Sequence, residues 1–472
     1  GSARHARPAR VAGGPMAAAS ASAPRLTSDL VSKAGRQGCA WLDDLAEHGR
    51  LVDDLAPLRR LAWARLFGII VGDSAEAWVE ALDTARRRYN ALLEEYQRET
   101  DVKSLDPNLC NPLARNSDNP YVKMQANEEL LKEIWKDVER TFPEEELLSS
   151  EESRKTLQRI LFHWCRAANP AKAASDSYRQ GMNELAAVCL AVAKRGEYAE
   201  GAWESSEALG HRLCGRQHSE ADAFALFARL MELGLRPMFM PGGGAPPRGA
   251  GARGSPIGEL PPPRAAGGRD QGPPSSAILA RCLFIFDTVV KRVDPALHAH
   301  LGRQEIEPQV FLLRWLRLLF SREFGLDETL PLWDGLFFDA LKPAVPPSAT
   351  ELVYPKHPKG AGEAAWREAA ESSAALPLVD YLAAAFLRSL RGELLLLDQT
   401  ECLRRLLATR PATSASSLLS AAHALRSSPS SEAVGGPVAV AAPLSPRGKG
   451  LPSARTSSSS LPQANGAVPH HP

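Results

Sequence analysis

Apolar side chains recur along most of this chain at steps of three and four residues, which is the period of one face of an α-helix. The clearest run spans 78–96, and its apolar positions are Trp78, Leu82, Ala85, Tyr89, Leu92 and Tyr96. Asp73 and Glu76 precede this run with the spacing of a capping box, so we expect the helix to begin there. Helical periodicity without the alternating pattern of a strand predicts an all-α protein.

The same period continues in the rest of the chain. Ser219 and Asp222 have the spacing to cap a helix that is buried through Phe224 and Phe227. Further apolar segments follow at 278–290, 306–320, 330–338 and 378–390. No repeat of fixed period relates these segments, so one irregular helical domain is favoured over a solenoid.

Composition divides the chain into folded blocks and tethers. Residues 241–275 are mainly Gly, Pro, Ala and Arg, and they have too few apolar side chains to offset the entropy of ordering them. We predict a disordered insertion there. The remaining predicted boundaries are a disordered lead at 1–25, an N-terminal lobe at 26–240, a C-terminal lobe at 276–408 with a loop at 341–375, and a disordered tail at 409–472.

Charge and cysteine usage exclude several classes of function. With 56 Lys and Arg against 55 Asp and Glu, the net charge of +1 lacks the surplus that nucleic-acid binding needs, so no nucleic-acid partner is expected. The 7 cysteines are spread singly, which favours reduced thiols over disulfides or a zinc site. No apolar run reaches the roughly eighteen residues of a membrane span, so any membrane contact is expected to be indirect. The acid-free, Arg-containing lead leaves an organelle transit peptide open as an alternative.

Familiar catalytic and cofactor motifs give no support for an enzyme with its own active site. Gly249, Gly251 and Gly254 fit GxGxxG, but they lie in the low-complexity stretch with no predicted strand before them. His298 and His300 are two residues apart, which places them on different faces of a helix and argues against a metal site. Walker, HExxH and GxSxG motifs do not occur. We therefore predict no cofactor and no metal of the chain's own.

One polar segment, IWKDVERTFP at 134–143, stands out in helical surroundings. Ile134, Asp137 and Arg140 follow one another at i, i+3 and i+6 along the expected helix. Pro143 is expected to stop this helix soon after Arg140, leaving the guanidinium at a helix end from which it can reach a partner. Taken alone, the segment favours an ordinary solvated arginine at a helix end.

A second polar segment, YRQGMNEL, opens an apolar helix at 178–185. Gly181 is a poor helix former, which indicates a special turn or a close backbone approach directly after Gln180. Taken alone, this segment fits a polar helix start with an ordinary surface glutamine.

Together the two segments closely resemble the two signature motifs of the TBC domain, the family of Rab GTPase-activating proteins. The arginine of IxxDxxRTFP is followed 40 residues later, from 140 to 180, by the glutamine of YxQGMNEL. The resemblance covers about 26–408, and its further motifs are Arg60-Leu61-Ala62-Trp63, Glu305-Ile306-Glu307-Pro308-Gln309 with Arg314-Trp315, and Leu332-Trp333-Asp334.

This resemblance implies a two-lobed, V-shaped helical domain whose N-terminal lobe carries the catalytic groove. It also implies that Arg140 is an arginine finger that stabilises the negative charge of the GTP hydrolysis transition state. Gln180 would orient the attacking water in place of the GTPase's own glutamine. The chain would then accelerate hydrolysis by a Rab-family small GTPase, with no hydrolase activity of its own.

The resemblance assigns support to five further residues. Asp137 would orient the finger region and Tyr178 would pack beside the glutamine, while Ile134, Gly181 and Asn183 match the motifs. GTP and magnesium would arrive with the Rab. The chain would work in the cytoplasm at the endomembrane that carries its Rab, with a cilium or another specialised compartment left open.

Two competing hypotheses stay open at this point. The first is a catalytically silent scaffold or effector that binds a Rab in membrane trafficking. The second is a helical interaction module unrelated to GTPases, which would be favoured if both fingers were buried or disordered. Intact arginine and glutamine at both motif positions favour the GTPase activator, because a pure binder requires neither.

Overall fold

The computed structural model describes residues 24–100, 119–168, 177–198, 209–240, 274–341, 362–408 and 413–427. All of them belong to one compact unit that spans residues 1–434. Within these ranges the chain forms helices and no named β-strand, with one isolated bridge between Leu26 and Tyr198. The prediction of an all-α fold is confirmed.

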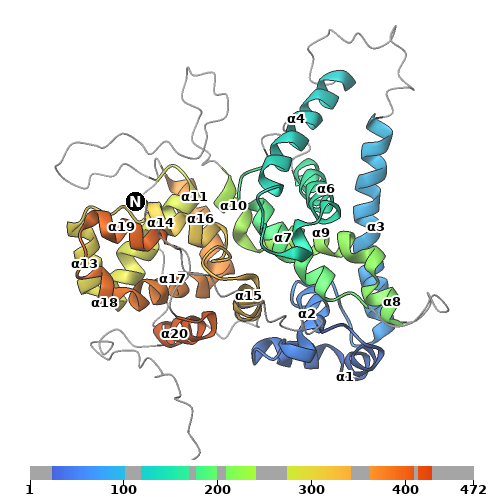
Figure 1. Ribbon diagram of the computed structural model, residues 1–472, viewed down its shortest axis with the longest axis horizontal. Helices are drawn as coiled ribbons and strands as arrows, with labels where there is room; N and C mark the ends of the chain where they lie inside the picture. The colour runs from blue at the N-terminus through green and yellow to red at the C-terminus, as the bar shows by residue number, and fades with distance from the viewer. Residues whose placement is uncertain are drawn as a thin grey trace, which may run out of the picture. The chain divides into compact units, whose positions relative to one another are not determined.

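The helices of the first half, up to residue 240, are coloured from blue to green in Figure 1. Their bounds are α1 Ser28–Glu47, η1 Asp53–Leu58, α2 Arg59–Leu66, α3 Ala75–Thr100, α4 Pro120–Val138, α5 Glu146–Ser149, α6 Glu151–Ala168, α7 Met182–Arg195, α8 Leu209–Cys214, η4 Arg216–His218, α9 Ser219–Leu230, η5 Met231–Leu235 and α10 Arg236–Phe239.

The helices of the second half begin at residue 277. Their bounds are α11 Ala277–Phe284, η6 Ile285–Val290, α12 Lys291–Val293, α13 Pro295–Arg303, α14 Gln309–Arg317, α15 Leu326–Leu341, α16 Glu363–Ala375, α17 Pro377–Ser389, α18 Arg391–Leu394, α19 Gln399–Leu407 and α20 Ala415–Ser427. In the part of the chain that the structure describes, every helix is too short or too polar to cross a bilayer.

Helix α7 forms the centre of the first half. Its residues are buried continuously from Met182 to Ala193, because α4, α5, α6, α9 and α2 all pack around it. A helix that is apolar on every face needs such complete coverage. The Gln180–Gly181 turn therefore lies at one fixed end of the core, and Lys194 lies at the other.

Buried ion pairs connect helices that are distant in the sequence. The Arg59 guanidinium donates hydrogen bonds to both carboxylate oxygens of Asp334 of α15 at 3.0 Å, and the Trp63 indole donates a further one at 2.7 Å. Trp63 and Trp333 stack with ring centres 5.9 Å apart. The larger apolar cluster runs without interruption from α2 to α20. The proposed boundary between two lobes stays a prediction.

Two predicted helix caps are wrong. The Ser74 hydroxyl, not Asp73, accepts a hydrogen bond from the Ala77 backbone N–H at 3.2 Å, and α3 begins at Ala75. Asp222 does not cap α9, because its carboxylate binds two buried arginines, Arg60 at 2.6 Å and Arg86 at 2.8 Å. A cap and a buried ion pair require the same residue types, and spacing alone does not distinguish them.

Two predicted irregular stretches contain helices. The stretch 341–375, expected to be a loop, includes α16, whose Ala365 and Ala369 are buried. The disordered tail was predicted to begin at residue 409, which is too early. Helix α20 lies within that stretch and packs against α15 and α17, with Leu418 and Ala422 buried. Both helices are rich in Ala and Ser, so their apolar period is faint. The predicted lead up to residue 23, the insertion from 241 to 273 and the tail beyond 427 lie outside the described residues.

Candidate functional site

The first motif forms the end of α4 and the turn that follows. The helix ends at Val138, two residues before Arg140, so Pro143 does not itself end the helix as the sequence suggested. The Thr141 hydroxyl donates to the Asp137 carbonyl oxygen at 2.7 Å, which closes the turn around Arg140. Phe142 adopts a positive φ of 42°, which is uncommon for a residue other than glycine. Arg140 thus projects from a tight turn rather than from a helix.

The Arg140 side chain is 58% exposed and forms an ion pair with Asp137, whose side chain is only 9% exposed. The second oxygen of Asp137 accepts a hydrogen bond from the Tyr178 hydroxyl at 2.8 Å. Burial raises the pKa of Tyr178, and the negative charge of Asp137 raises it further, so the hydroxyl stays protonated and donates. Asp137 therefore lies between the two motifs, bound to one residue of each.

The second motif forms a sharp turn at the start of α7. Gly181 has a φ of 104°, and a Cβ atom at this position would lie 3.0 Å from Leu318 Cδ2 and 3.4 Å from Phe239 Cε1. The turn therefore requires glycine for both its backbone conformation and its close packing. Gln180, immediately before it, is partly exposed, and no side chain of the described residues holds its amide by a hydrogen bond.

The buried side chain of Asn183 also connects the two motif turns. The Asn183 carbonyl oxygen accepts a hydrogen bond from the Gly181 backbone N–H at 2.9 Å, and its amide nitrogen donates to the Thr141 hydroxyl at 2.8 Å. Asn183 is 2% exposed and Thr141 is 3% exposed. The turn that carries Gln180 is thereby tied to the turn that carries Arg140.

The structure thus brings six of the seven predicted site residues into one region, and Ile134 is the exception. Its side chain is fully buried in the apolar core, so it anchors α4 rather than contacting the polar groups. Tyr178 was expected to pack beside the glutamine. Its hydroxyl reaches across to Asp137, and its packing beside the glutamine stays a prediction.

Sequence analysis missed other groups at this site. Thr141 lies inside the first motif, but nothing in its spacing indicated that it would accept a hydrogen bond from Asn183. Glu184 pairs with Arg322, which lies between α14 and α15. Burial raises the pKa of Glu184, and Arg322 opposes this rise. No sequence signal links residues that are this far apart in the chain.

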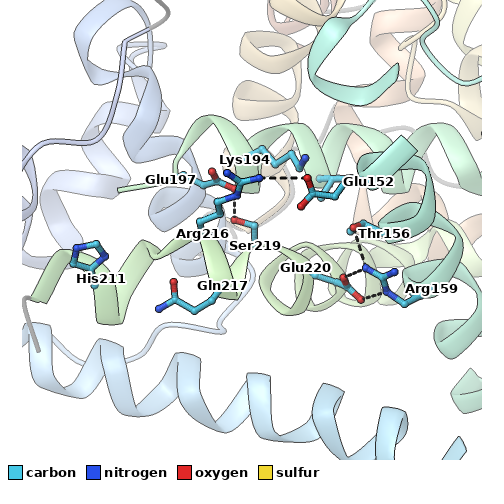
Figure 2. A pocket seen from close by; sticks show the side chains of 11 residues that line it. Glu152, Thr156, Arg159, Lys194, Glu197, His211, Arg216, Gln217, Ser219 and Glu220 are labelled. Carbon is cyan, nitrogen blue, oxygen red and sulfur yellow. Dashed lines mark hydrogen bonds and ion pairs between the residues drawn. The ribbon is translucent and has the colours of Figure 1, made fainter. Parts of the chain in front are cut away.

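A separate pocket of about 670 Å³ lies between α6, α7 and α9, near the Lys194 end of α7 (Figure 2). Figure 2 shows Arg159 turned toward Glu220 and Arg216 turned toward Glu152, and both are ion pairs. These pairs balance the charge of the pocket, and the pocket lies at the opposite end of α7 from Gln180. It is not part of the site that the two motifs form.

Metal-binding groups do not gather at the site. Across the described ranges, no group of three or more His, Cys, Asp or Glu side chains could hold a metal ion. The polar groups of the site are instead one exposed guanidinium, one partly exposed amide and the buried residues that hold them.

Comparison with known proteins places the chain in a family. The model of the Rab-GTPase-TBC domain matches residues 57–244 and 272–346, more than half of the chain. The human protein named TBC1 domain family member 5 is 32% identical over 290 residues, which cover 60% of this chain and 34% of that protein. A Dictyostelium discoideum protein named TBC1 domain family member 5 homolog B is 25% identical over 367 residues, again with 60% of this chain and 34% of the relative covered.

The chain therefore spans about a third of the length of these curated relatives. The fold is similar to the crystal structure of the Ypt/Rab-GAP domain of Gyp1p, with a TM-score of 0.51 and 18% sequence identity, covering 82% of this chain and 92% of that one. At this identity the likeness concerns the fold alone. On the strength of the family match, the chain belongs to the Rab-GTPase-TBC domain family.

Proposed function

We propose that this protein accelerates GTP hydrolysis by a Rab-family small GTPase, with Arg140 and Gln180 entering the GTPase active site together. The observation that carries the proposal is the tie between the two turns. Asn183 links the Gln180 turn to Thr141, and Asp137 links Arg140 to Tyr178. Two polar groups held at a fixed separation are what a two-point contact with one reacting phosphate requires.

The physical role of Arg140 follows from its charge and geometry. Negative charge spreads over the phosphoryl oxygens in the transition state, and an arginine supplied by a partner protein is worth about 10³ to 10⁵ in rate. A guanidinium is planar, permanently charged and able to form two parallel hydrogen bonds. Its high exposure in the free protein leaves Arg140 accessible to such oxygens.

Gln180 supplies a neutral amide that both donates and accepts hydrogen bonds. Such a group can hold the attacking water in line with the bond that breaks. The sharp turn at Gly181, which packs against Leu318 and Phe239, fixes where the Gln180 backbone lies. Because no described side chain competes for the amide, it is free to bind a water molecule.

GTP and magnesium belong to the GTPase in this proposal. The chain would meet a membrane through the Rab that it binds, at the cytoplasmic face of an endomembrane. The family relation supports a Rab partner, and the identity of that Rab follows from the experiment below.

The test is single-turnover GTP hydrolysis by a panel of Rab proteins, with and without the full chain. We expect acceleration of at least one Rab. Arg140→Ala should lower the accelerated rate by about 10³ or more, and Gln180→Ala by about 10². Arg140→Lys should also be impaired, because lysine keeps the charge beside Asp137 but cannot form two parallel hydrogen bonds.

Matched controls use the same residue types away from the site. Arg303→Ala at the end of α13 and Gln125→Ala on α4 remove exposed side chains and should leave the rate unchanged. Urea unfolding of each variant verifies that the fold is intact. Binding of Rab proteins without acceleration of any of them would refute the proposal and favour a catalytically silent Rab-binding scaffold.

A further inference from the structure

Two arginines lie beside the Gln180 turn, and neither has a role in the chemistry proposed above. Arg179 directly precedes Gln180 in the chain. Arg317 is the last residue of α14, and the next residue, Leu318, packs directly on Gly181. The end of α14 therefore forms one wall of the surface around Gln180.

Arg317 is held in place by a backbone carbonyl oxygen and an aromatic ring. Its Nε donates to the Met238 carbonyl oxygen at 2.8 Å, and its guanidinium lies 5.7 Å from the ring centre of Phe239. Burial lowers the pKa of Arg317, and the positive charge of Arg179 lowers it further. Phe239 also lies 3.4 Å from the position that a Cβ of Gly181 would take, so the Arg317 guanidinium lies near the turn that Arg179 enters.

Buried arginines elsewhere in this protein are neutralised by carboxylates. The pairs are Arg59 with Asp334, Arg60 and Arg86 with Asp222, and Arg281 with Asp380. Within the described part of the chain, no carboxylate forms an ion pair with Arg317 or Arg179. Burial raises the pKa of Glu133 and the positive charge of Arg179 opposes this rise, but the two side chains form no ion pair.

Other neighbours do not supply the missing negative charge. Burial raises the pKa of Cys282 to about 12, so this thiol next to Arg317 is neutral. The C-terminal end of α14 favours a cation by only about 0.3–1 kcal/mol. A partly buried charge without a counterion is costly, so its retention points to an anion that arrives with a partner.

We infer that Arg317 and Arg179 form an anion-binding pair beside Gln180 that docks a carboxylate side chain on the surface of the GTPase. The inference rests on the proposed function for the identity of the partner. The pair lies next to the glutamine turn, and no carboxylate of the described residues forms an ion pair with either guanidinium. A carboxylate matches the planar fork of a guanidinium, and two arginines can share one such group.

The experiment measures docking and catalysis separately. The affinity of the full chain is measured for each Rab of the panel, loaded with a non-hydrolysable GTP analogue, and single-turnover rates are measured over a range of chain concentrations. Arg317→Gln should weaken binding by about tenfold or more. The rate at saturating chain concentration should stay within about twofold, because a docking contact contributes equally to the ground and transition states.

Companion variants show whether charge is the cause. Arg317→Lys keeps the charge and should bind more tightly than Arg317→Gln. Arg179→Gln should weaken binding in the same way, and the double variant should lose less than the product of the two single effects because both arginines bind one group. Arg303→Gln removes the same charge from an exposed site and should not change the affinity.

The possible outcomes are distinct. Unchanged affinity of Arg317→Gln and Arg179→Gln would overturn the inference. A lower saturating rate at unchanged affinity would also overturn it, because the arginines would then act on the reacting phosphate. If the wild-type chain binds a Rab but does not accelerate it, the proposed function fails while the affinity comparison still decides the inference. If no Rab binds, the inference fails with the docking that it requires.

Discussion

Replacement of Thr141 by valine tests whether the two motif turns are mechanically coupled. Valine has nearly the same shape as threonine, so the change replaces the hydroxyl by a methyl group and removes its hydrogen bonds. That hydroxyl accepts a hydrogen bond from the Asn183 amide at 2.8 Å and donates one to the Asp137 carbonyl oxygen at 2.7 Å. Thr141 contacts no partner protein through these atoms, because it is only 3% exposed.

The expected loss of stability follows from the two hydrogen bonds. A buried N–H of Asn183 without an acceptor costs about 1–3 kcal/mol, and the lost bond to the carbonyl oxygen adds about 1 kcal/mol. The Asp137 carbonyl itself retains the Arg140 backbone N–H at 3.3 Å. We therefore expect the free energy of unfolding to fall by about 2–4 kcal/mol, measured by urea denaturation.

The effect on function should exceed what stability alone explains. A displacement of about 1 Å at a catalytic group can lower the rate about 10²-fold. Under conditions in which the variant stays folded, Thr141→Val should therefore lower the single-turnover rate at saturating chain concentration by about 10² while Rab affinity changes little. Thr141→Ser keeps the hydroxyl and should lose only about 1 kcal/mol of stability, from one missing methyl group, with nearly full activity.

A double-mutant cycle with Asn183→Ala completes the test. If Asn183 transmits its effect through Thr141, the two substitutions should be strongly non-additive in the rate. Additive effects, or a Thr141→Val variant with a wild-type rate, would refute the idea that this hydrogen bond sets the separation of the fingers.

Two further predictions concern backbone strain and pH. Gly181→Ala should lower the free energy of unfolding by about 1–3 kcal/mol because of its φ of 104°. It should also lower the hydrolysis rate at saturating chain concentration. The control Gly49→Ala, where φ is 60° and the space around the residue is open, should lower stability without changing that rate. Burial lowers the pKa of His163 from 6.5 to about 4, a difference of about 2.5 that is worth about 3 kcal/mol. The unfolded chain protonates this imidazole more readily than the folded chain does. The stability that the neutral His163 contributes is therefore present above pH 6.5 and is lost as the pH falls toward 4. Between pH 7.5 and pH 5, the free energy of unfolding measured in urea should fall less for His163→Phe than for the wild type. An equal fall in both proteins would contradict the role of His163 in this pH dependence.

Helical periodicity was sufficient to predict the fold class, because large apolar residues such as Trp78 and Tyr89 mark a buried face. Helical periodicity does not reveal a helix whose buried residues are small. In α16 the core positions are Ala365 and Ala369, and alanine is nearly as common on exposed helix faces as on buried ones. Weak contrast between the faces explains why this helix was expected to be a loop.

The candidate site was predictable only as far as each motif is local. Arg140 and Gln180 were identified from two short segments. The residues that link them could not be, because a hydrogen bond between residues 141 and 183 depends on how two helices pack. Arg317 illustrates the same limit, since its position beside Gly181 depends on contacts between α10, α14 and the start of α7.

The ion pair between buried Asp137 and exposed Arg140 orients the arginine but holds it only weakly. Fixing a flexible arginine side chain costs about 1.5–2 kcal/mol of rotamer entropy, and the pair with Asp137 reduces this loss before a partner arrives. Because the guanidinium is 58% exposed, solvent screens the pair, and its net strength is about 0–1 kcal/mol. A pair of this strength orients the guanidinium and, in the proposed mechanism, would not prevent its transfer to phosphoryl oxygens. Tyr178 would still hold the second oxygen of Asp137 after such a transfer, so the buried carboxylate would keep its position while the arginine changed partner.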